Sequence, residues 1–444
     1  MSTTLAAGTS LDFTLAQQLT VIALCALTAY ISHMALAVFN DGVRPFLLDF
    51  IQGRTTRSAT TAVSFGLSAG FIFGLGAPMA LSTGVLNPWL VFLPTDILGM
   101  LAPKKWLAPI LGGAWGAVVV FGLNGANNVA HDLPVDFITA MQQMSTPILF
   151  LFTLFPVLAI TKQFGRKWGA VAGVLELALV VMTMKVWPKM FAGALAMAVG
   201  VLMLIALAVA QDMKQRKADR AAGVTEAVLE DDPMASLFSA SAARLRQYLP
   251  LFMVLGAGVC VLAQMHIFGG GEATSFLIAK GQYSEAAQVD FYRVFGFIPL
   301  IATTALASGA YGIAGFTLVY PIGYLMPNPF LAAVVGAVVF AAEVLALSYI
   351  GKLLGKLPSV RDSSEHLRSA IGDTLQLAIL FGSLMAANAM GGGLGILVVG
   401  GLYLLNEAMG RPVVKMAAAP AAVIVGGILL NVLYWLDLFT PIKG

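Results

Sequence analysis

FLPTDILGMLAPKKWLAPILGGAWGA, from Phe92 to Ala117, is a short apolar segment broken by proline and glycine and followed at once by a long apolar one. A second stretch of the same design, FTLVYPIGYLMPNPFLAAVVGAVVFA, runs from Phe316 to Ala341. With Phe92 aligned to Phe316, the two stretches are identical at eight of 26 positions. Just upstream, AlaLeuSerThrGly at 80–84 corresponds to AlaLeuAlaSerGly at 305–309. The pattern predicts an internal repeat.

The composition of the whole chain is typical of a membrane protein. Of its 444 residues, 59% are hydrophobic and 11% are charged, and the mean hydropathy is +0.88. Soluble domains carry roughly 25% charged residues. The composition therefore excludes a soluble enzyme, a secreted disulfide scaffold and a nucleic-acid-binding domain. Cys25 and Cys260 lie inside apolar runs, where we expect them to serve in packing, and the four histidines have no metal-ligand spacing.

Apolar runs long enough to cross a bilayer recur along the chain. We predict 14 transmembrane segments, at 17–39, 58–82, 85–102, 105–124, 146–163, 168–187, 190–211, 249–270, 291–313, 314–327, 329–351, 373–390, 392–408 and 417–438. Segments 85–102 and 314–327 are short and interrupted, so each either crosses or re-enters. If both cross, 20 Lys and Arg residues fall on one side and four or five on the other. The positive-inside rule favours that count and places both termini outside the cytoplasm.

The predicted spans divide the chain into two transmembrane halves, 1–211 and 248–444, joined by a charged cytoplasmic linker at 212–247. Each half has seven spans, an odd number, so the second half is inserted upside down relative to the first. The predicted fold is an all-α polytopic membrane protein built from two inverted repeats with broken helices. Such folds are typical of secondary transporters, because two pseudosymmetric halves can expose one central site to either side.

We therefore expect a secondary active transporter, of the elevator type, that moves a small polar metabolite with a coupling Na⁺ or H⁺ and no cofactor. Gly- and Ala-rich late spans suit close helix packing and favour a homodimer. One alternative is the membrane component of a multi-subunit or phosphotransferase-type uptake system, with soluble partners docking on 212–247. A second is an integral membrane enzyme, which would need a catalytic or metal cluster that the sequence does not display.

Polar side chains inside spans are costly and are candidates for function. Asp96 ranks first, because a carboxyl beside the break at Pro94 has freed backbone groups nearby. The other predicted substrate- or ion-binding residues lie in the two broken regions or in mid-span, and they are Thr95, Asn87, Ser82, Thr83, Thr303, Thr304, Ser308 and Glu343. Asp96 has a second interpretation as a helix cap, Glu343 as a neutral structural acid, and the hydroxyls as packing residues.

Several motifs resemble the YhfT family of bacterial inner-membrane proteins. They include AlaValPheAsnAspGlyValArgPro at 37–45, PheLeuProThrAspIleLeuGly at 92–99, IleAlaThrThrAlaLeuAlaSerGly at 301–309 and LeuAsnGluAlaMetGlyArgProVal at 405–413. The resemblance covers nearly the whole chain, least well around 212–243. It implies a multi-pass protein of the inner membrane whose members are regarded as transporters. Genes for pyridoxal-phosphate enzymes and a phosphotriesterase-like hydrolase accompany enterobacterial members, which implies an amine- or phosphate-bearing metabolite.

The family motifs also draw attention to two acid–arginine pairs at the predicted cytoplasmic surface, Asp41 with Arg44 and Glu407 with Arg411. Their functional interpretation is a gate made of salt bridges. The alternative is helix capping and anchoring of the topology.

Overall fold

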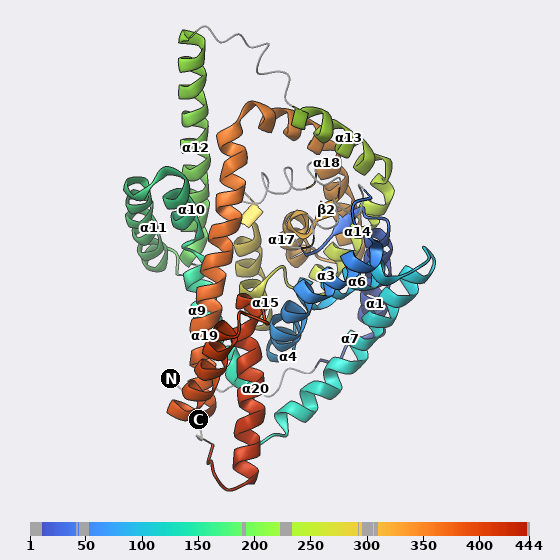
Figure 1. Ribbon diagram of the computed structural model, residues 1–444, viewed down its shortest axis with the longest axis vertical. Helices are drawn as coiled ribbons and strands as arrows, with labels where there is room; N and C mark the ends of the chain where they lie inside the picture. The colour runs from blue at the N-terminus through green and yellow to red at the C-terminus, as the bar shows by residue number, and fades with distance from the viewer. Residues whose placement is uncertain are drawn as a thin grey trace.

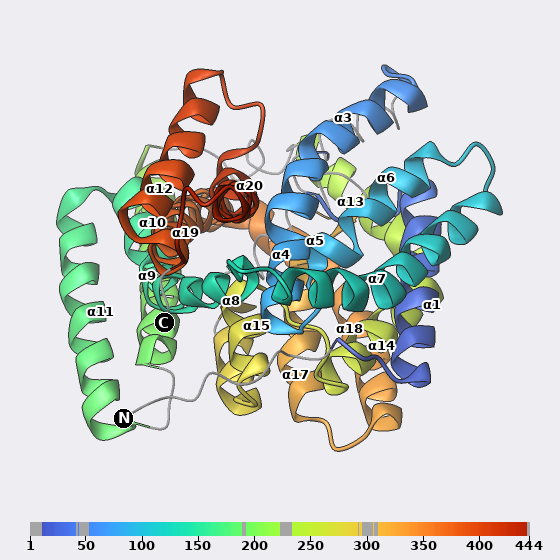
Figure 2. The same ribbon diagram turned by 90° about the horizontal axis from the view of Figure 1, so that it is seen from below.

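The computed structural model describes residues 11–40, 43, 53–188, 192–222, 233–291, 293, 294, 305 and 310–441. Within these residues the chain forms two bundles of helices that stand side by side (Figures 1 and 2). We call them the central bundle and the flanking bundle.

The central bundle draws on both halves of the sequence. Its elements from the first half are α1 (Leu15–His33), β1 (Ala37–Val38), α3 (Arg57–Phe71), the π-helical turn η2 (Ile72–Gly76), α4 (Ala77–Thr83), α5 (Pro88–Val91), α6 (Leu93–Leu101) and α7 (Leu107–His131). Its elements from the second half are α13 (Pro233–Gln247), α14 (Leu249–Gln264), α15 (Glu272–Ala279), β2 (Tyr311–Gly312), the 3-10 helix η5 (Ile313–Leu318), α17 (Val319–Leu325) and α18 (Pro329–Lys356).

The flanking bundle also combines both halves. It contains α8 (Phe137–Met141), η3 (Gln142–Met144), α9 (Ser145–Phe152), α10 (Phe155–Phe164), α11 (Arg166–Val186), α12 (Ala192–Ala221), α19 (Pro358–Ala408) and α20 (Lys415–Trp435). α19 packs against α9, α10 and α20 and forms the centre of this bundle. The two bundles meet where α20 lies against η2, α8 against α4, and α9 against α15.

Local sequence signals place the ends of the helices. Thr14 and Gln17 form a capping box at the start of α1. Asn87 caps α5 through the N–H of Leu90, and Pro88 occupies the first turn. Gly84 ends α4 in the left-handed conformation, at φ +70°.

α19 is a helical hairpin, because the chain reverses at Gly391 and Gly392, where the backbone leaves helical geometry. Beyond the turn, Gly395 lies against the carbonyl oxygen of Ala387. Such a close approach needs glycine, because a Cβ would collide with that oxygen. The predicted boundary between spans 373–390 and 392–408 falls at this turn.

Eight helices of the described residues are long and apolar enough to cross a membrane, and a ninth results if α13 and α14, bent by 69°, form one span. The architecture is therefore all-α and polytopic. The predicted spans 85–102 and 314–327 correspond to shorter apolar helices, Pro88–Leu101 and Gly315–Leu325. Most of 291–313 lies outside the described residues.

Two groups of three helices in the central bundle make matching contacts. In the first unit α1 packs on α6 and α7, and in the second unit α14 packs on α17 and α18. Gly99 of α6 faces the carbonyl oxygen of Ala29, whereas Gly323 of α17 faces that of Cys260. The two glycines occupy equivalent positions of the sequence repeat. Their contacts make Ala29 and Cys260 equivalent as well.

The next helix of each unit, α7 and α18, shows the same correspondence of contacts. Gly112 of α7 lies against the Cys25 carbonyl oxygen and the Ala29 Cβ. Gly336 of α18 lies against the Gly256 carbonyl oxygen and the Cys260 Cβ. Small residues at these positions let backbones approach closely, as is common between membrane helices.

Short extended segments join the two units reciprocally. β1, just after α1, pairs in parallel with β2, just before η5 and α17. Leu86, just before α5, forms a parallel bridge with Phe268, just after α14. The N–H of Tyr311 donates to Leu36 O at 2.8 Å, and the N–H of Leu86 donates to Ile267 O at 2.7 Å. In each unit, the segment before the interrupted helix (Leu86 or β2) thus pairs with the segment after the first helix of the other unit (Phe268 or β1).

Gly336→Ala is expected to destabilise the protein, because the new Cβ would lie 2.5 Å from the Gly256 carbonyl oxygen. Overpacking of this kind costs about 1–3 kcal/mol. In the matched variant Gly401→Ala the new methyl meets no atom within 4 Å, and better helix propensity is worth up to about 1 kcal/mol. The apparent Tm of the full-length protein in detergent should therefore fall in the first variant and not in the second. Equal values would contradict the close contact.

Candidate functional site

A buried carboxyl holds the turn that follows α1. This turn spans residues 34–40 and contains Ala35 at φ +53°. Oδ2 of Asp96 accepts the N–H groups of Phe39 at 2.6 Å and Asn40 at 3.0 Å. Oδ1 accepts the Ser32 hydroxyl at 2.6 Å. Asp96, in the first turn of α6, therefore satisfies two backbone donors that no helix could satisfy.

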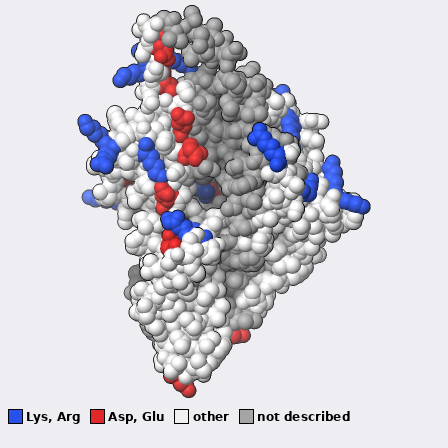
Figure 3. All heavy atoms as spheres, in the orientation of Figure 1, with Lys and Arg blue, Asp and Glu red and all other residues white. Residues whose placement is uncertain are grey.

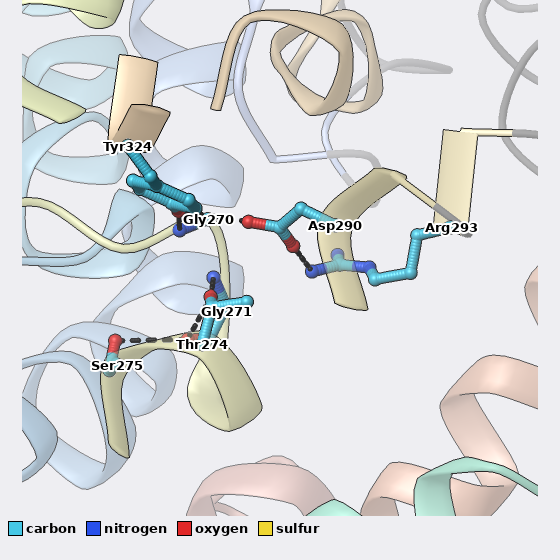
Figure 4. A network of polar contacts seen from close by, with 7 residues as sticks. All are labelled: Gly270, Gly271, Thr274, Ser275, Asp290, Arg293 and Tyr324. Atoms are coloured by element: carbon cyan, nitrogen blue, oxygen red, sulfur yellow. Dashed lines mark hydrogen bonds and ion pairs between the residues drawn. The ribbon is translucent and has the colours of Figure 1, made fainter. Parts of the chain in front are cut away.

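The turn that follows α14 is held in a different way (Figure 4). The N–H of Gly270 donates to the hydroxyl oxygen of Tyr324 at 2.8 Å. The same hydroxyl donates to Oδ2 of Asp290 at 2.9 Å. Arg293 Nη1 donates to Oδ1 of Asp290 at 2.8 Å, in an ion pair whose carboxyl is fully buried. We call Gly270, Glu272, Asp290, Arg293, Tyr320 and Tyr324 the acidic cluster.

Hydroxyl side chains complete the start of α15. The N–H of Gly271 donates to Thr274 Oγ1 at 2.9 Å, and the hydroxyls of Thr274 and Ser275 donate back to Gly271 O at 3.0 and 2.9 Å (Figure 4). These bonds use both hydroxyls locally. They leave the neighbouring acid, Glu272, to other partners.

An acid and a tyrosine of the acidic cluster each have a buried oxygen without a hydrogen-bond partner among the described residues. These oxygens are Oε1 of Glu272 and the hydroxyl of Tyr320. Glu272 is 4% exposed and Tyr320 is 2% exposed. An unpaired buried polar group costs about 1–3 kcal/mol, so such atoms in a native fold call for a partner, which can be an ordered water, an ion or a ligand. Burial raises the pKa of Glu272, which lies outside the spanning helices, to about 7, although Arg293 opposes the shift.

Aromatic rings fill the space where the two units cross. Phe92 and Phe316, which are equivalent in the sequence repeat, meet edge to face at 5.1 Å between centroids. Phe39 lies 5.2 Å from Phe92, and Phe268 lies 5.4 Å from it on another side. All four rings are fully buried. They keep water from the strand pairings.

The structure gives three predicted site residues local partners. Asp96 is buried in the turn contacts described above. The Thr95 hydroxyl donates to Phe92 O at 2.7 Å, within its own helix. Asn87 caps α5 and donates from Nδ2 to Gly76 O at 2.7 Å. These bonds do not bring Thr95 or Asn87 together with Asp96.

The other predicted residues are scattered. Ser82 and Thr83 both donate to Met79 O, at 3.2 and 2.6 Å. Glu343 is 9% exposed on α18, and neither of its carboxyl oxygens has a partner among the described residues. Thr303, Thr304 and Ser308 lie outside the described residues, as do Asp41 and Arg44.

Of the predicted gate residues, Glu407 and Arg411 lie where the structure describes them. Arg411 Nε donates to Glu407 Oε2 at 2.7 Å, in a partly exposed pair four residues apart. Asn406 ties the following loop, because its side chain both donates to and accepts from the Val413 backbone at 2.9 Å. The pair thus lies at a loop between α19 and α20 that side-chain hydrogen bonds hold in place.

The acidic cluster is what sequence reasoning missed. Gly270, Glu272, Asp290 and Arg293 lie between predicted spans or at their edges, whereas Tyr320 and Tyr324 lie inside the predicted span 314–327 and carry no charge. The emphasis on charges inside spans therefore did not single them out. One signal was available: Gly269-Gly-Gly271 followed directly by Glu272. A glycine run brings the backbone close to neighbouring side chains, and here Asp290 and Tyr320 lie against Gly270.

A separate apolar cavity of about 530 Å³ opens at the boundary of the two bundles. It is lined by α4, α7, α8 and α20, including Pro78, Leu81, Phe137, Ile424 and Ile428. Its lining is apolar and suits hydrocarbon better than a polar solute. The cavity also shows that the two bundles are not closely packed along their whole boundary.

These features define a polytopic α-helical membrane protein with a buried, charged centre. Comparison of the sequence with known families then identifies its family. Residues 17–439 match the family YhfT, described as a protein of unknown function. The chain is 41% identical to the uncharacterized protein YhfT of Escherichia coli (strain K12) over 437 residues, which cover 96% of this chain and 99% of that protein. The chain belongs to the YhfT family, as its motifs indicated. No solved structure matches.

Asp96→Ala is expected to destabilise the protein, because it leaves the N–H groups of Phe39 and Asn40 without an acceptor. Each buried unpaired donor costs about 1–3 kcal/mol. Asp96→Asn should cost less, since the amide oxygen can accept both N–H groups while its NH₂ faces the Ser32 hydroxyl. Apparent Tm in detergent measures both, with Asp373→Ala, at an exposed site, as the control. A loss as large for Asn as for Ala would mean that the charge matters beyond the turn.

Tyr324→Phe is expected to lower the apparent Tm, since it deprives the Gly270 N–H of its acceptor and Asp290 of a donor. The loss should be about 1–3 kcal/mol for each group left unpaired. Tyr349→Phe, at a position 75% exposed, is the matched control and should change little. An unaltered Tm for Tyr324→Phe would show that the hydroxyl does not hold the turn.

Proposed function

We propose that this protein is a secondary active transporter, in which the two units form an inverted repeat and the acidic cluster binds a small polar solute. The observation that carries the proposal is the reciprocal pairing of β1 with β2 and of Leu86 with Phe268. Together with the matching glycine contacts in the two units, it supports a two-fold relation between them. Halves related in this way are a common basis of alternating access.

The position of the acidic cluster supports a role in binding. It lies at the boundary of the bundles, because α15 packs against α9 and the Arg293 guanidinium lies 5.7 Å above the Phe152 ring of α9. Both signs of charge are present, which suits a solute with an amine together with a carboxylate or phosphate group. Movement of the central bundle along the flanking bundle would uncover this cluster.

The distribution of charge supports the proposed orientation. On the face shown in Figure 3, Lys and Arg side chains lie over the upper and middle parts, and none of those described is visible at the lower end. Basic residues concentrate on the cytoplasmic side of membrane proteins. The upper end, toward which α12 extends, is therefore the proposed cytoplasmic end.

The function is tested by a ligand screen on the purified full-length protein. Polar metabolites that carry amine, carboxylate or phosphate groups are added with and without Na⁺ at two pH values, and apparent Tm is recorded. A ligand at 100 times its Kd stabilises by about 2.7 kcal/mol. The radiolabelled hit should then exchange across proteoliposomes without ATP. Asp290→Asn should abolish both signals, whereas Asp373→Asn should not.

Other outcomes identify the alternatives. Chemical conversion of the hit by the purified protein would indicate an enzyme. Uptake that requires an added soluble protein would indicate a component of a multi-subunit system. A hit that stabilises Asp290→Asn as much as the native protein would remove the acidic cluster from the site.

A further inference from the structure

Glu272 differs from Asp290, the other carboxyl of the acidic cluster, because one of its two carboxyl oxygens has no hydrogen-bond partner among the described residues. It is the first residue of α15 and is 4% exposed. Oε1 has no hydrogen-bond partner among the described residues, while the neighbouring hydroxyls of Thr274 and Ser275 donate to Gly271 O. By contrast, Asp290 accepts from both Arg293 and Tyr324. Glu272 is therefore available for a proton or another ligand.

The ionisable groups around Glu272 come from few elements. Asp290 and Arg293 follow in the helical segment that begins at residue 283, and Tyr320 and Tyr324 belong to α17. α4 and α9 pack against α15, and neither contains an ionisable residue. The ion pair of Arg293 with Asp290 leaves this surrounding close to neutral. A buried acid beside a neutral, apolar surface is stable as the protonated form.

The contact of α15 with α9 is also a contact between the bundles. In the structure, where this contact is closed, Glu272 is 4% exposed. An opening of the contact that admits water to the carboxyl would stabilise its ionised form. The proton and the contact are thus thermodynamically linked, because each favours the state in which the other is present.

We propose that Glu272 is a proton-binding site whose occupancy is linked to the contact between α15 and α9, and that it is the coupling site of the carrier. The second part rests on the proposed function. Burial raises the pKa of Glu272 to about 7 in the closed state. The closed contact is therefore favoured below the ordinary carboxyl pKa and loses this contribution as pH rises through about 7.

The first experiment detects the proton. Full-length protein in lipid nanodiscs is titrated from about pH 5 to pH 9, a range that spans the ordinary and the raised carboxyl pKa, and the infrared band of protonated carboxyl groups is recorded. A component should disappear with a midpoint near 7. It should be missing in Glu272→Gln and kept in Glu407→Gln. An unchanged titration in Glu272→Gln would overturn the proposal.

The second experiment detects the linkage through hydrogen exchange of α15 and α9. After correction for the intrinsic pH effect, opening of the contact should increase by up to about tenfold per pH unit above the midpoint. Glu272→Gln, which mimics the neutral acid, should exchange slowly at all pH values. If this variant does not fold, Glu272→Asp replaces it and should shift the midpoint. Opening with the same pH dependence in the native protein and the variant would overturn the proposal.

The outcomes separate this inference from the proposed function. If a metabolite is transported and its proton dependence survives Glu272→Gln, the coupling assignment is wrong and the transporter stands. If the infrared and exchange results are as expected but the screen gives no transported solute, the proton site stands and the transporter does not.

Discussion

The architecture depends on satisfying backbone hydrogen-bonding groups where helices are broken inside an apolar bundle. In hydrocarbon an unpaired N–H or C=O costs several kcal/mol, so a break survives only where other groups replace the lost helical bonds. Here the replacement is mutual, since the Leu36 carbonyl accepts from Tyr311 and the Ile267 carbonyl accepts from Leu86. Neither unit can close its own break without the other. The close glycine contacts, the aromatic rings at the crossing and the buried acids all serve this arrangement.

The two units use different side chains to hold the turn after their first helix. In the first, the Asp96 carboxyl accepts the N–H groups of the turn directly. In the second, the equivalent position of the repeat is Tyr320, and the turn is held by Tyr324, backed by Asp290 and Arg293. The first unit has used its acid for structure. The second unit has in addition a buried acid, Glu272, whose Oε1 has no hydrogen-bond partner among the described residues, so the two units differ chemically.

Sequence alone predicted the helical class and the two interrupted segments. The Pro and Gly interruptions in 85–102 and 314–327 indicated the short helices at Pro88–Leu101 and Gly315–Leu325, and the identities between the two stretches led to the prediction that they correspond. Asp96 was predicted as a site residue because it lies in an apolar run beside the helix break at Pro94. Its partners could not be predicted, because they are backbone N–H groups of a turn 57 and 56 residues away. The correspondence of α1 with α14 was also out of reach, since apolar helices carry little residue-specific signal.

Asn87 carries a structural signal that the site prediction did not use, and other residues were not predicted at all. Asn87 followed by Pro88 is a helix-start signature, and its side chain does cap α5. Asn87 was instead predicted to bind substrate or an ion, because it is a polar residue in an apolar segment. Asp290 was not predicted because it lies in a mixed polar segment. Tyr324 was not predicted because it resembles an ordinary interfacial tyrosine. Only the tertiary structure shows that the Tyr324 hydroxyl donates a hydrogen bond to the Asp290 carboxylate.

The reciprocal strand pairing also has a consequence for biosynthesis. The first unit is synthesised long before Tyr311 is, yet the carbonyl of Leu36 has no strand partner until that residue arrives. The N–H of Leu86 likewise waits for residue 267. Contacts between residues so far apart in sequence form late and slow the search for the native state. During synthesis the first half would therefore have its helices inserted but these backbone pairings unformed until the second half follows. A chain cut between the halves would have two incomplete centres, each complementary to the other.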